Sequence, residues 1–377
     1  MNRLAILGST GSIGQSAVDV VRHRPGDFAV TALAAGTRAG ELADQCREFS
    51  AHAAALSTEP PVGLDFGRAE VGCGDDAIDA LVSRDDVDTV VAAIVGAAGL
   101  RSTLAAARAG KRIALANKEA MVVAGPLVKQ AAAESGATIW PVDSEHSALL
   151  QALEAGPRDR VRRVILTASG GRFRNCTAAE LDAVTPEEAG VHPTWDMGPK
   201  ITIDSGTLMN KALEVIEAAW LFDLRPDQID VVVHPQSIVH GLVEFVDGSV
   251  IAQLSPPDMK LPIQLALTWP DRRDAPTERL DLAALGRLDF EEPDTDRFPA
   301  LRLAYDVLRA GGTAGAVLNA ANEVAVQRFV DGDLRFTQIA TLCRDVLRHH
   351  NHDPSPDLAG LMTQDRLARE EAARWNA

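Results

Sequence analysis

Apolar runs that alternate with helical patterns fill the first part of the chain. The runs are short, end in glycine or polar residues, and stand at residues 4–7, 28–35, 87–93 and 112–116. Such runs are typical of buried parallel strands. Helical patterns lie between them, for example from Leu100 to Ala109. Because parallel strands are joined by crossover helices, the alternation predicts an N-terminal Rossmann-like parallel sheet domain, which we place at residues 1–150.

The hydrophobic pattern changes after Glu154. A strand is predicted from Val164 to Ala168, and a helix with an apolar stripe begins near Leu208. Three more strands, separated by turn residues, are predicted at residues 229–233, 239–245 and 250–254. Strands joined by turns need no helical crossovers, so we predict a central α+β catalytic domain at residues 151–270.

The last part of the chain has the pattern of a helical bundle. Residues 271–297 are rich in proline and charge and are predicted to be a linker. Helical patterns follow at residues 300–309, 314–330, 339–347 and 361–375. We therefore predict a C-terminal helical domain at residues 298–377. The chain is too long for one ordinary domain, and the fold class that we expect is α/β with these two further parts.

Composition and charge narrow the classes of partner. An apolar fraction of 46% is enough for sizeable cores, and the 24% of charged residues form no long block of one sign. The net charge of −16 disfavours binding to nucleic acid or to an anionic membrane. The four cysteines are scattered, and we see neither a signal peptide nor an apolar run of membrane-spanning length. These features predict a soluble cytoplasmic protein without disulfides.

A glycine-rich turn, Gly8-Ser9-Thr10-Gly11-Ser12-Ile13-Gly14, follows the first predicted strand and opens a helix. In this arrangement backbone N–H groups and a helix N-terminus can bind a pyrophosphate. The spacing G-x-x-G-x-x-G is a relative of the dinucleotide fingerprint and is less specific alone. The turn is therefore predicted to bind a dinucleotide, and the alternative is a tight turn that binds nothing.

The end of the second predicted strand indicates which dinucleotide is bound. Cofactors without a 2′-phosphate usually meet an acidic residue there. This chain has Gly36, Thr37 and Arg38 instead. A cation and a small polar group favour NADPH over NADH, unless Arg38 is only an exposed arginine at a helix start.

Asp143 and Glu145 follow an apolar run that ends near Val142. If the strand continues through them, both carboxylates point the same way and Ser144 points opposite. Two aligned carboxylates repel unless a cation neutralises them, one is protonated, or both face water. We test the interpretation that they bind a divalent metal, and the alternative is a solvated acidic pair.

Polar residues at other element ends extend the candidate site. Asn117-Lys118-Glu119 and Ser169-Gly170-Gly171 end two predicted strands. Asn210, Lys211 and Glu214 lie off the apolar stripe of their helix, at spacings that let Glu214 meet the other two. The lysine, the asparagine and two possible hydroxyls at this helix start suit a phosphate, whereas a solvated face that carries a Lys/Glu pair is the alternative.

The segment at residues 190–200 has neither a helical nor a strand period, although it carries His192, Trp195 and Met197. Large apolar side chains on a loop need something to cover, so a lid over a site is predicted. The alternative is a loop whose tryptophan packs permanently on its own domain.

Several of these motifs together resemble the 1-deoxy-D-xylulose 5-phosphate reductoisomerase family, which contains isomerising NADPH-dependent reductases of the non-mevalonate isoprenoid pathway. The resemblance spans essentially the whole chain. It rests on residues 8–14, 117–119, 141–146, 192–198 and 204–214. The resemblance implies an oxidoreductase that converts 1-deoxy-D-xylulose 5-phosphate to 2-C-methyl-D-erythritol 4-phosphate, by a metal-assisted retro-aldol and aldol rearrangement followed by hydride transfer.

The same resemblance implies the site residues. Mg²⁺ or Mn²⁺ would be held by Asp143, Glu145 and Glu214. NADPH would contact Thr10, Gly11, Ser12, Ile13, Gly36, Thr37, Arg38, Asn117, Glu119 and Gly198. The substrate would be lined by Lys118, Ser144, Glu145, Ser169, His192, Ser205, Asn210, Lys211 and Glu214, with its phosphate at Ser169, Ser205, Asn210 and Lys211. Catalysis would fall to Lys118, Glu145, His192 and Glu214, and the protein would be a homodimer.

This chain departs from the family pattern at Thr37 and Arg38, where relatives commonly carry a basic residue and then asparagine. The sequence leaves open which of the two meets the 2′-phosphate and whether His192 orients substrate or relays a proton. Two rival functions are weighed: a metal-independent NADP dehydrogenase of the homoserine or aspartate-semialdehyde type, and a non-catalytic NADPH sensor. The dehydrogenase should need no divalent ion, and the sensor gives no reason for Asp143, Glu145 and Glu214 to converge.

Overall fold

The computed structural model describes residues 1–195 and 198–376, which form two compact units. The first unit comprises residues 1–120, 126–147 and 258–278, and the second comprises the rest of the described chain. Helices α5 (Lys118–Ser135) and α6 (Ser144–Leu153) each contribute residues to both units. Helix α5 contains Pro126 and is kinked at Ala124, because proline cannot supply the backbone N–H that a continuous helix needs.

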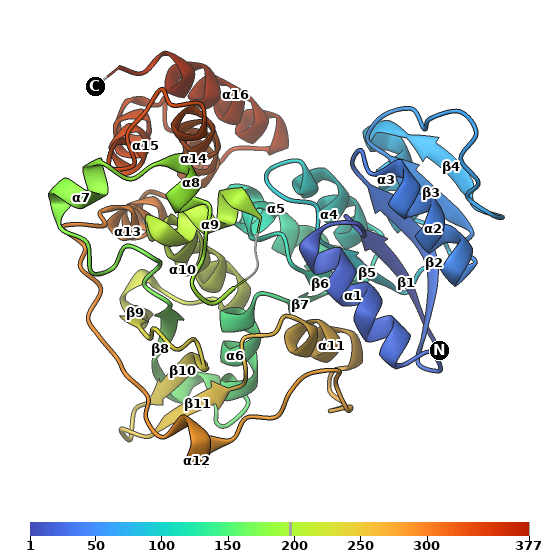
Figure 1. Cartoon of the computed structure of the whole chain (residues 1–377), viewed down its shortest axis with the longest axis horizontal. Coiled ribbons are helices and arrows are strands. Elements are labelled where there is room, and N and C mark those ends of the chain that lie inside the picture. The colour runs from blue at the N-terminus through green and yellow to red at the C-terminus, as the bar shows by residue number, and fades with distance from the viewer. Residues whose placement is uncertain (196–197, 377) are drawn as a thin grey trace. The chain divides into compact units, whose positions relative to one another are not determined.

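A parallel sheet of seven strands forms the centre of the first unit, in the order β4-β3-β2-β1-β5-β6-β7 (Figure 1). Every strand pair is parallel, which confirms the predicted Rossmann-like domain. The order reverses at β1, and in such sheets ligands bind outside the carboxyl ends of the strands at that point. The strands are β1 (Asn2–Leu7), β2 (Phe28–Ala35), β3 (Ala53–Leu56), β4 (Glu70–Cys73), β5 (Thr89–Ala92), β6 (Arg112–Leu115) and β7 (Thr138–Pro141).

Helices bury their apolar faces on this sheet. In α1 the residues Ala17, Val18, Val20 and Val21 are buried, as the sequence pattern predicts. The helices are α1 (Ser12–His23), α2 (Ala39–Phe49), α3 (Gly74–Val82), α4 (Gly99–Arg108) and most of α5, together with α11 (Lys260–Thr268), which packs on α1 although it lies far along the chain.

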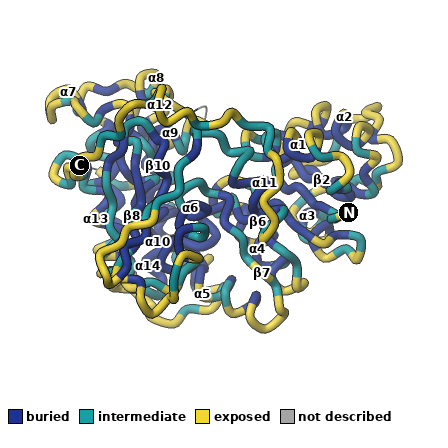
Figure 2. Tube along the Cα trace, turned by 90° about the horizontal axis from the view of Figure 1, so that it is seen from below, coloured by how far each residue is buried: buried dark blue, intermediate teal, exposed yellow. Residues whose placement is uncertain are grey.

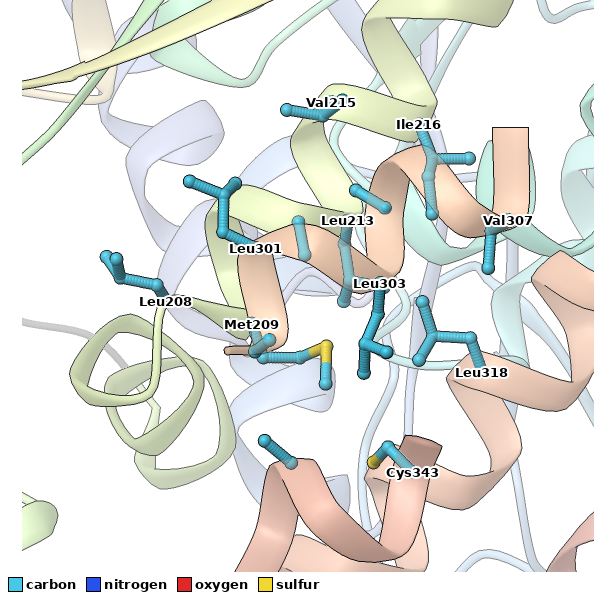
Figure 3. Packing of buried hydrophobic residues seen from close by; sticks show 14 of the residues in the cluster. Leu208, Met209, Leu213, Val215, Ile216, Leu301, Leu303, Val307, Leu318 and Cys343 are labelled. Carbon is cyan, nitrogen blue, oxygen red and sulfur yellow. The ribbon is translucent and has the colours of Figure 1, made fainter. Parts of the chain in front are cut away.

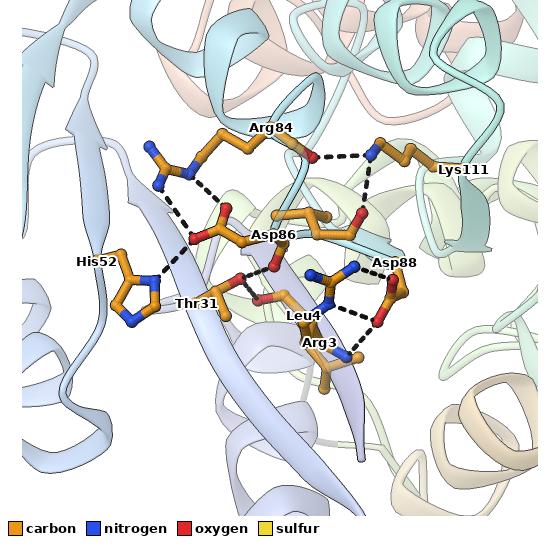
Figure 4. Close-up of polar contacts among 9 residues, drawn as sticks. Arg3, Leu4, Thr31, His52, Arg84, Asp86, Asp88 and Lys111 are labelled. Atoms are coloured by element: carbon orange, nitrogen blue, oxygen red, sulfur yellow. Dashed lines mark hydrogen bonds and ion pairs between the residues drawn. The ribbon is translucent and has the colours of Figure 1, made fainter.

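A polar network ties together chain segments at the amino ends of the strands (Figure 4). Asp86 accepts hydrogen bonds from Arg84 (Nε–Oδ1 2.7 Å) and pairs with His52 (Nδ1–Oδ2 2.7 Å). Nearby, Arg3 donates to both carboxylate oxygens of Asp88. The contacts with Arg84, more than any other, hold the pKa of Asp86 well below its usual range. The ionised carboxylate of Asp86 therefore stabilises the folded state.

We expect Asp86→Asn to reduce the free energy of unfolding at pH 7 by about 1–3 kcal/mol, because a charged acceptor is lost. Since the folded-state pKa of Asp86 lies below the unfolded value near 3.9, its contribution is present above about pH 4 and is lost as the pH falls further. Urea unfolding between pH 7 and pH 3 should show the difference from wild type shrinking in acid. Asp85→Asn, an exposed neighbour, is the control, and an equal effect there would contradict the assignment.

The second unit is built on a mixed sheet of four strands in the order β11-β10-β8-β9. Strand β10 is antiparallel to both neighbours, whereas β8 and β9 are parallel. The strands are β8 (Val161–Ala168), β9 (Ile229–Val233), β10 (Val239–Phe245) and β11 (Val250–Leu254), and the last three match the predicted bounds. The chain between β8 and β9 forms the helices α7 (Ala178–Asp182), α8 (Pro186–Ala189), α9 (Pro199–Gly206) and α10 (Met209–Phe222). The sequence analysis did not predict α9.

The four predicted C-terminal helices are confirmed as α13 (Ala300–Ala310), α14 (Ala314–Val330), α15 (Gln338–His349) and α16 (Leu358–Arg374). They share one hydrophobic core with α10 and β8. Figure 3 shows Met209 and Leu213 of α10 among Leu301, Leu303 and Leu318. The helical bundle thereby holds α10 in place from its apolar side.

The predicted linker is mostly irregular. It contains the short helix α12 (Leu282–Leu285), which is largely exposed (Figure 2), and Glu291 forms an antiparallel bridge with Val233 at the free side of β9. In the described part of the chain, no helix is both long enough and apolar enough to cross a membrane.

One local prediction is wrong. Strand β7 ends at Pro141, and α6 begins at Ser144, so Asp143 and Glu145 do not continue a strand. The carbonyl oxygen of Asp143 accepts a hydrogen bond from the backbone N–H of Ser147 (2.8 Å), as in a helix cap. Aspartate is a favoured cap residue, and Glu145 in the first turn interacts well with the helix dipole. The two acids are thus positioned by a helix start, and the alternation argument does not apply to them.

Candidate active site

The glycine-rich turn after β1 depends on close backbone contacts. Gly8 has a φ of +79°, and a Cβ on it would lie 2.5 Å from the carbonyl oxygen of Ala93. A Cβ on Gly14 would lie 2.2 Å from the carbonyl oxygen of Gly8. The N–H of Gly11 donates to the same Gly8 oxygen (2.9 Å). Only glycine allows the start of α1 to approach the turn so closely, which leaves the first turn of the helix accessible to a ligand.

A cavity of about 330 Å³ lies over this turn in the first unit. Among the predicted NADPH contacts, the residues that line it are Thr10, Gly11, Gly36, Thr37 and Arg38. Ser12 and Ile13 form the first turn of α1 beside it but are not part of its wall. The cavity therefore brings together the residues after β1 and after β2, as expected for a dinucleotide site.

Asn117 and its neighbours begin α5. The Oδ1 atom of Asn117 accepts from the N–H of Ala120 (2.8 Å), and its Nδ2 donates to the carbonyl oxygens of Ile94 (2.5 Å) and Gly96 (2.9 Å). Ile94 lines the cavity. Asn117 thus fixes the wall of the cavity from behind, and neither it nor Glu119 is part of that wall.

The acids at the start of α6 lie close to a lysine and a histidine of the same unit. The Nζ of Lys118 is 2.5 Å from Oδ2 of Asp143, and both side chains are largely buried. The Nδ1 of His146, which is fully buried, is 3.8 Å from the same oxygen. Ser144 donates to Oε2 of Glu145 (2.5 Å), so these neighbours point together and not apart as predicted. Asp143 and Glu145 are therefore not a solvated pair.

In the second unit, His192 contacts the loop after β8. Its Nδ1 accepts hydrogen bonds from the N–H groups of Thr194 (3.1 Å) and Trp195 (3.0 Å). An Nδ1 that accepts twice carries no proton, so the proton of the neutral ring is on Nε2. That atom lies 3.0 Å from Oγ of Ser169. Burial also lowers the pKa of His192, which favours this neutral form.

Ser169 accepts a second hydrogen bond, from the N–H of Gly171 (3.2 Å). With two donors pointing at its oxygen, the hydroxyl hydrogen of Ser169 is available to donate elsewhere. Gly170 and Gly171 have φ values of +79° and +67°, and a Cβ on Gly171 would lie 2.8 Å from the carbonyl oxygen of Ser205. The glycines thus bring the Ser169 loop against Ser205 of α9.

The start of α10 carries the other predicted substrate residues. Leu208, in the left-handed region at a φ of +60°, forms the sharp turn between α9 and α10. Glu214 accepts from Nδ2 of Asn210 (2.5 Å) and from Nζ of Lys211. Lys211 is 3% exposed and Glu214 is 1% exposed, so this is no solvated surface pair. The predicted meeting of these three side chains is confirmed.

The segment at residues 190–200 is only partly described. Met197, a predicted lid residue, lies outside the described residues. Trp195 packs edge-on against His240 of β10, with the ring centroids 6.2 Å apart. Gly198 is the cap residue of α9 in the second unit and does not belong to the cavity of the first. Trp195 thus contacts its own unit.

Comparison with known proteins covers the whole chain. Residues 4–125 match a model described as 1-deoxy-D-xylulose 5-phosphate reductoisomerase, and residues 139–222 and 254–371 match models of its C-terminal domains. The reductoisomerase of Xanthomonas axonopodis pv. citri is 53% identical over 100% of this chain and 98% of its own length. The corresponding protein of Pelodictyon phaeoclathratiforme is 51% identical over the full length of both.

This chain belongs to the 1-deoxy-D-xylulose 5-phosphate reductoisomerase family. Solved structures of reductoisomerases have the same fold. One, in complex with NADPH, fosmidomycin and magnesium, is 42% identical, with a TM-score of 0.93 over 99% of this chain and 97% of that one. The enzyme of Zymomonas mobilis in complex with NADPH is 43% identical, with a TM-score of 0.91 over 99% and 98%. Family membership removes the two rival interpretations.

The sequence analysis passed over four polar residues that the structure places near the candidate site residues. His146 lies beside Asp143, and His240 lies beside Trp195. Glu217, one helical turn after Glu214, is fully buried. Ser57 lines the nucleotide cavity. Had residues 144–147 been predicted as the start of a helix, His146 would have been placed beside Asp143. Ser57 could not have been found in this way, because the strand before it, β3, is a run of alanines without a motif.

Proposed function

We propose that this chain converts 1-deoxy-D-xylulose 5-phosphate to 2-C-methyl-D-erythritol 4-phosphate, with NADPH as reductant and a divalent metal ion as cofactor. The observation that carries the proposal is the full-length match to a reductoisomerase solved with NADPH, fosmidomycin and magnesium. The chemistry is an isomerisation of the sugar phosphate skeleton followed by reduction. Retro-aldol cleavage and aldol addition as the route of isomerisation stays a prediction.

The nucleotide cavity of the first unit fits NADPH. The first turn of α1 lies beside this cavity with its backbone N–H groups, and at Gly8 and Gly14 the backbone comes closer than any Cβ would allow. Both features suit a pyrophosphate. When bound, NADPH supplies the hydride for the reduction. We assign Thr10, Gly11, Ser12, Ile13, Gly36, Thr37 and Arg38 to its binding, with Asn117, Glu119 and Gly198 as further contacts.

The donor atoms of Asp143, Glu145 and Glu214 fit Mg²⁺ or Mn²⁺. Carboxylate oxygens are the ligands that these ions prefer, and each of the three side chains offers one. When bound, the ion supplies Lewis acidity to a substrate carbonyl and a neighbouring hydroxyl. In the first unit Lys118 contacts Asp143, and in the second unit Lys211 contacts Glu214.

The second unit has the donors that a phosphate needs. The hydroxyl of Ser169 can donate because its oxygen already accepts from His192 and Gly171. Ser205 lies against the same loop, and Asn210 and Lys211 add an amide and a cation at the start of α10. We assign the substrate phosphate to Ser169, Ser205, Asn210 and Lys211, and the rest of the substrate to Lys118, Ser144, Glu145 and Glu214.

His192 acts by orientation. Both of its ring nitrogens are engaged, Nδ1 by two backbone N–H groups and Nε2 by Ser169. A proton relay would need one of them to exchange partners. In our proposal His192 holds the Ser169 hydroxyl toward the phosphate, and the segment at residues 190–200 serves as the lid that excludes water.

A homodimer is part of the proposal. Strand β11 is at the edge of its sheet, where Val250 and Ile251 are 48% and 40% exposed, and Val246 in the turn before it is 61% exposed. An apolar edge strand is a surface that a second copy can cover. The cytoplasmic location stays a prediction.

We expect Ile251→Glu to shift the protein from dimer to monomer, because a carboxylate would be buried against the second copy. Sedimentation velocity at micromolar concentration measures the change. Val62→Glu in the first unit, at a fully exposed position, should leave the sedimentation coefficient unaltered. A dimer that persists in the Ile251 variant places the interface elsewhere.

The experiment that tests the function is NADPH oxidation with 1-deoxy-D-xylulose 5-phosphate, with Mg²⁺ and with excess chelator. We expect turnover only when the sugar phosphate and the metal are both present. Turnover that survives the chelator, or that needs a different substrate, would refute the proposed function.

A further inference from the structure

We propose that this chain selects NADPH over NADH through Ser57 and Arg38 acting together on the 2′-phosphate, and that Glu41 limits the affinity by competing for Arg38. The inference rests on the proposed function and deepens it, because it names the residues that discriminate between the two cofactors in this chain. It assigns the contact with the 2′-phosphate to Arg38 and not to Thr37. It also adds Ser57 and Glu41, which lie outside the predicted set of site residues.

The first step is the position of Ser57. Strands β2 and β3 are neighbours and parallel, with Ala35 opposite Leu56, so Gly36 and Ser57 leave the sheet side by side. The N–H of Ser57 donates to the carbonyl oxygens of Ala35 (3.2 Å) and Gly36 (3.3 Å). A Cβ on Gly36 would be 4.0 Å from Oγ of Ser57, and no atom lies closer to it. The Ser57 hydroxyl therefore faces the glycine over which the ribose of a dinucleotide passes.

The second step is the charge of the cavity wall. Its charged residues are two arginines, Arg38 and Arg101, and two aspartates, Asp75 and Asp79. Arg101 is held by Asp76 and Asp79 through hydrogen bonds from its guanidinium. Arg38 has a looser partner, Glu41, at 3.6 Å, and both side chains are about half exposed, at 53% and 48%. An exposed pair at this distance contributes little, so Arg38 is the arginine that can turn to a ligand.

The third step is the match to the ligand. A phosphate monoester carries nearly two negative charges and accepts several hydrogen bonds. Arg38, the cap residue of α2, offers a charged fork, and Ser57 offers a hydroxyl donor from the neighbouring strand end. Both residues line the same cavity. The end of β2 has no acid to bind the 2′-hydroxyl of NADH, so NADH gains nothing from either residue.

Thr37 has a different role. Its carbonyl oxygen accepts the N–H of Ala39 (2.9 Å), which closes the turn into α2. Glu41, one turn into the same helix, is the only described carboxylate that pairs with Arg38. Removal of its charge frees Arg38 without altering the cavity wall, because Glu41 does not line it.

The test is the pair of dissociation constants for NADPH and NADH, measured by fluorescence titration of the full-length protein. We expect Arg38→Ala to weaken NADPH about 30-fold and Ser57→Ala about 5- to 10-fold, with NADH unchanged within about 2-fold. Glu41→Gln should tighten NADPH by about 2- to 5-fold. Arg38→Ala and Ser57→Ala should also weaken the binding of 2′,5′-ADP and leave the binding of 5′-ADP unaffected.

The matched controls are Arg108→Ala and Ser83→Ala, exposed residues of the first unit outside the cavity wall. They should bind both cofactors as the wild type does, and thermal unfolding shows whether each variant is folded. If Arg38→Ala or Ser57→Ala has the same ratio of NADPH to NADH dissociation constants as the wild type, the inference is overturned while the proposed function stands. A wild-type chain that does not bind NADPH overturns both.

Discussion

Glu214→Gln is expected to lower metal-dependent turnover on the order of 1,000-fold, because an amide cannot supply the negative charge that a hard divalent ion requires. The substitution keeps the size of the side chain, and the amide oxygen can still accept from Lys211, whose Nζ contacts the carboxylate in the wild type. NADPH affinity should stay at the wild-type value, since the nucleotide cavity belongs to the other unit. Steady-state NADPH oxidation across a magnesium titration measures the effect.

Two controls separate loss of the metal from loss of the fold. Glu187→Gln, in the short helix α8 of the same unit, removes one acidic charge at a distance from α10 in sequence and should leave turnover unchanged. Thermal unfolding should show that the Glu214 variant remains folded. If that variant reaches the wild-type turnover at the same magnesium concentrations as the wild type, Glu214 is not a metal ligand.

Gly14→Ala is expected to weaken NADPH binding on the order of 100-fold and to reduce stability by about 1–3 kcal/mol, the usual range for forced overpacking. The new Cβ would lie 2.2 Å from the carbonyl oxygen of Gly8 and 2.6 Å from backbone atoms of Ser9. All of these neighbours are backbone, so no side chain can move aside, and the turn that we propose holds the pyrophosphate must open. Fluorescence titration with NADPH and urea unfolding measure the two effects.

Gly40→Ala is the matched control for that substitution. Gly40 lies in helix α2, and nothing is within 4 Å of where its Cβ would be. Alanine is a better helix former than glycine, so this variant should be neutral or more stable by up to about 1 kcal/mol, with wild-type NADPH affinity. If both variants bind NADPH equally well, the close approach of α1 to the turn is not needed for binding.

The parallel sheet could be predicted because its strands are buried on both faces and are therefore continuous apolar runs. Strands β9, β10 and β11 have the predicted bounds because turn residues punctuate them on either side. In contrast, the short strands β3 and β4 were not predicted, since Ala53–Leu56 and Glu70–Cys73 have no strong strand pattern. Helix α9 was missed because Ile201 and Ile203 alternate with polar residues as they would in a strand.

The candidate site likewise has features that could be predicted from the sequence and features that could not. The turn after β1 and the spacing of Asn210, Lys211 and Glu214 are local features that a sequence displays directly. The conformation of Asp143 and Glu145 is not local in this sense, because an Asp-x-Glu pair suits a strand end and a helix start equally well. Ser57 could not be found either, since its place beside Gly36 depends on the pairing of β2 with β3, residues far apart along the chain.

The discontinuous first unit has a consequence for how the protein is made. Helix α11, which packs on α1, belongs to residues 258–278, whereas the sheet it joins is built from residues before 142. During synthesis, the apolar face of α1 that α11 covers stays exposed to solvent until the ribosome has released more than 100 further residues. A nascent chain stalled before residue 258 should therefore need chaperone protection, although all seven strands of its sheet have already emerged.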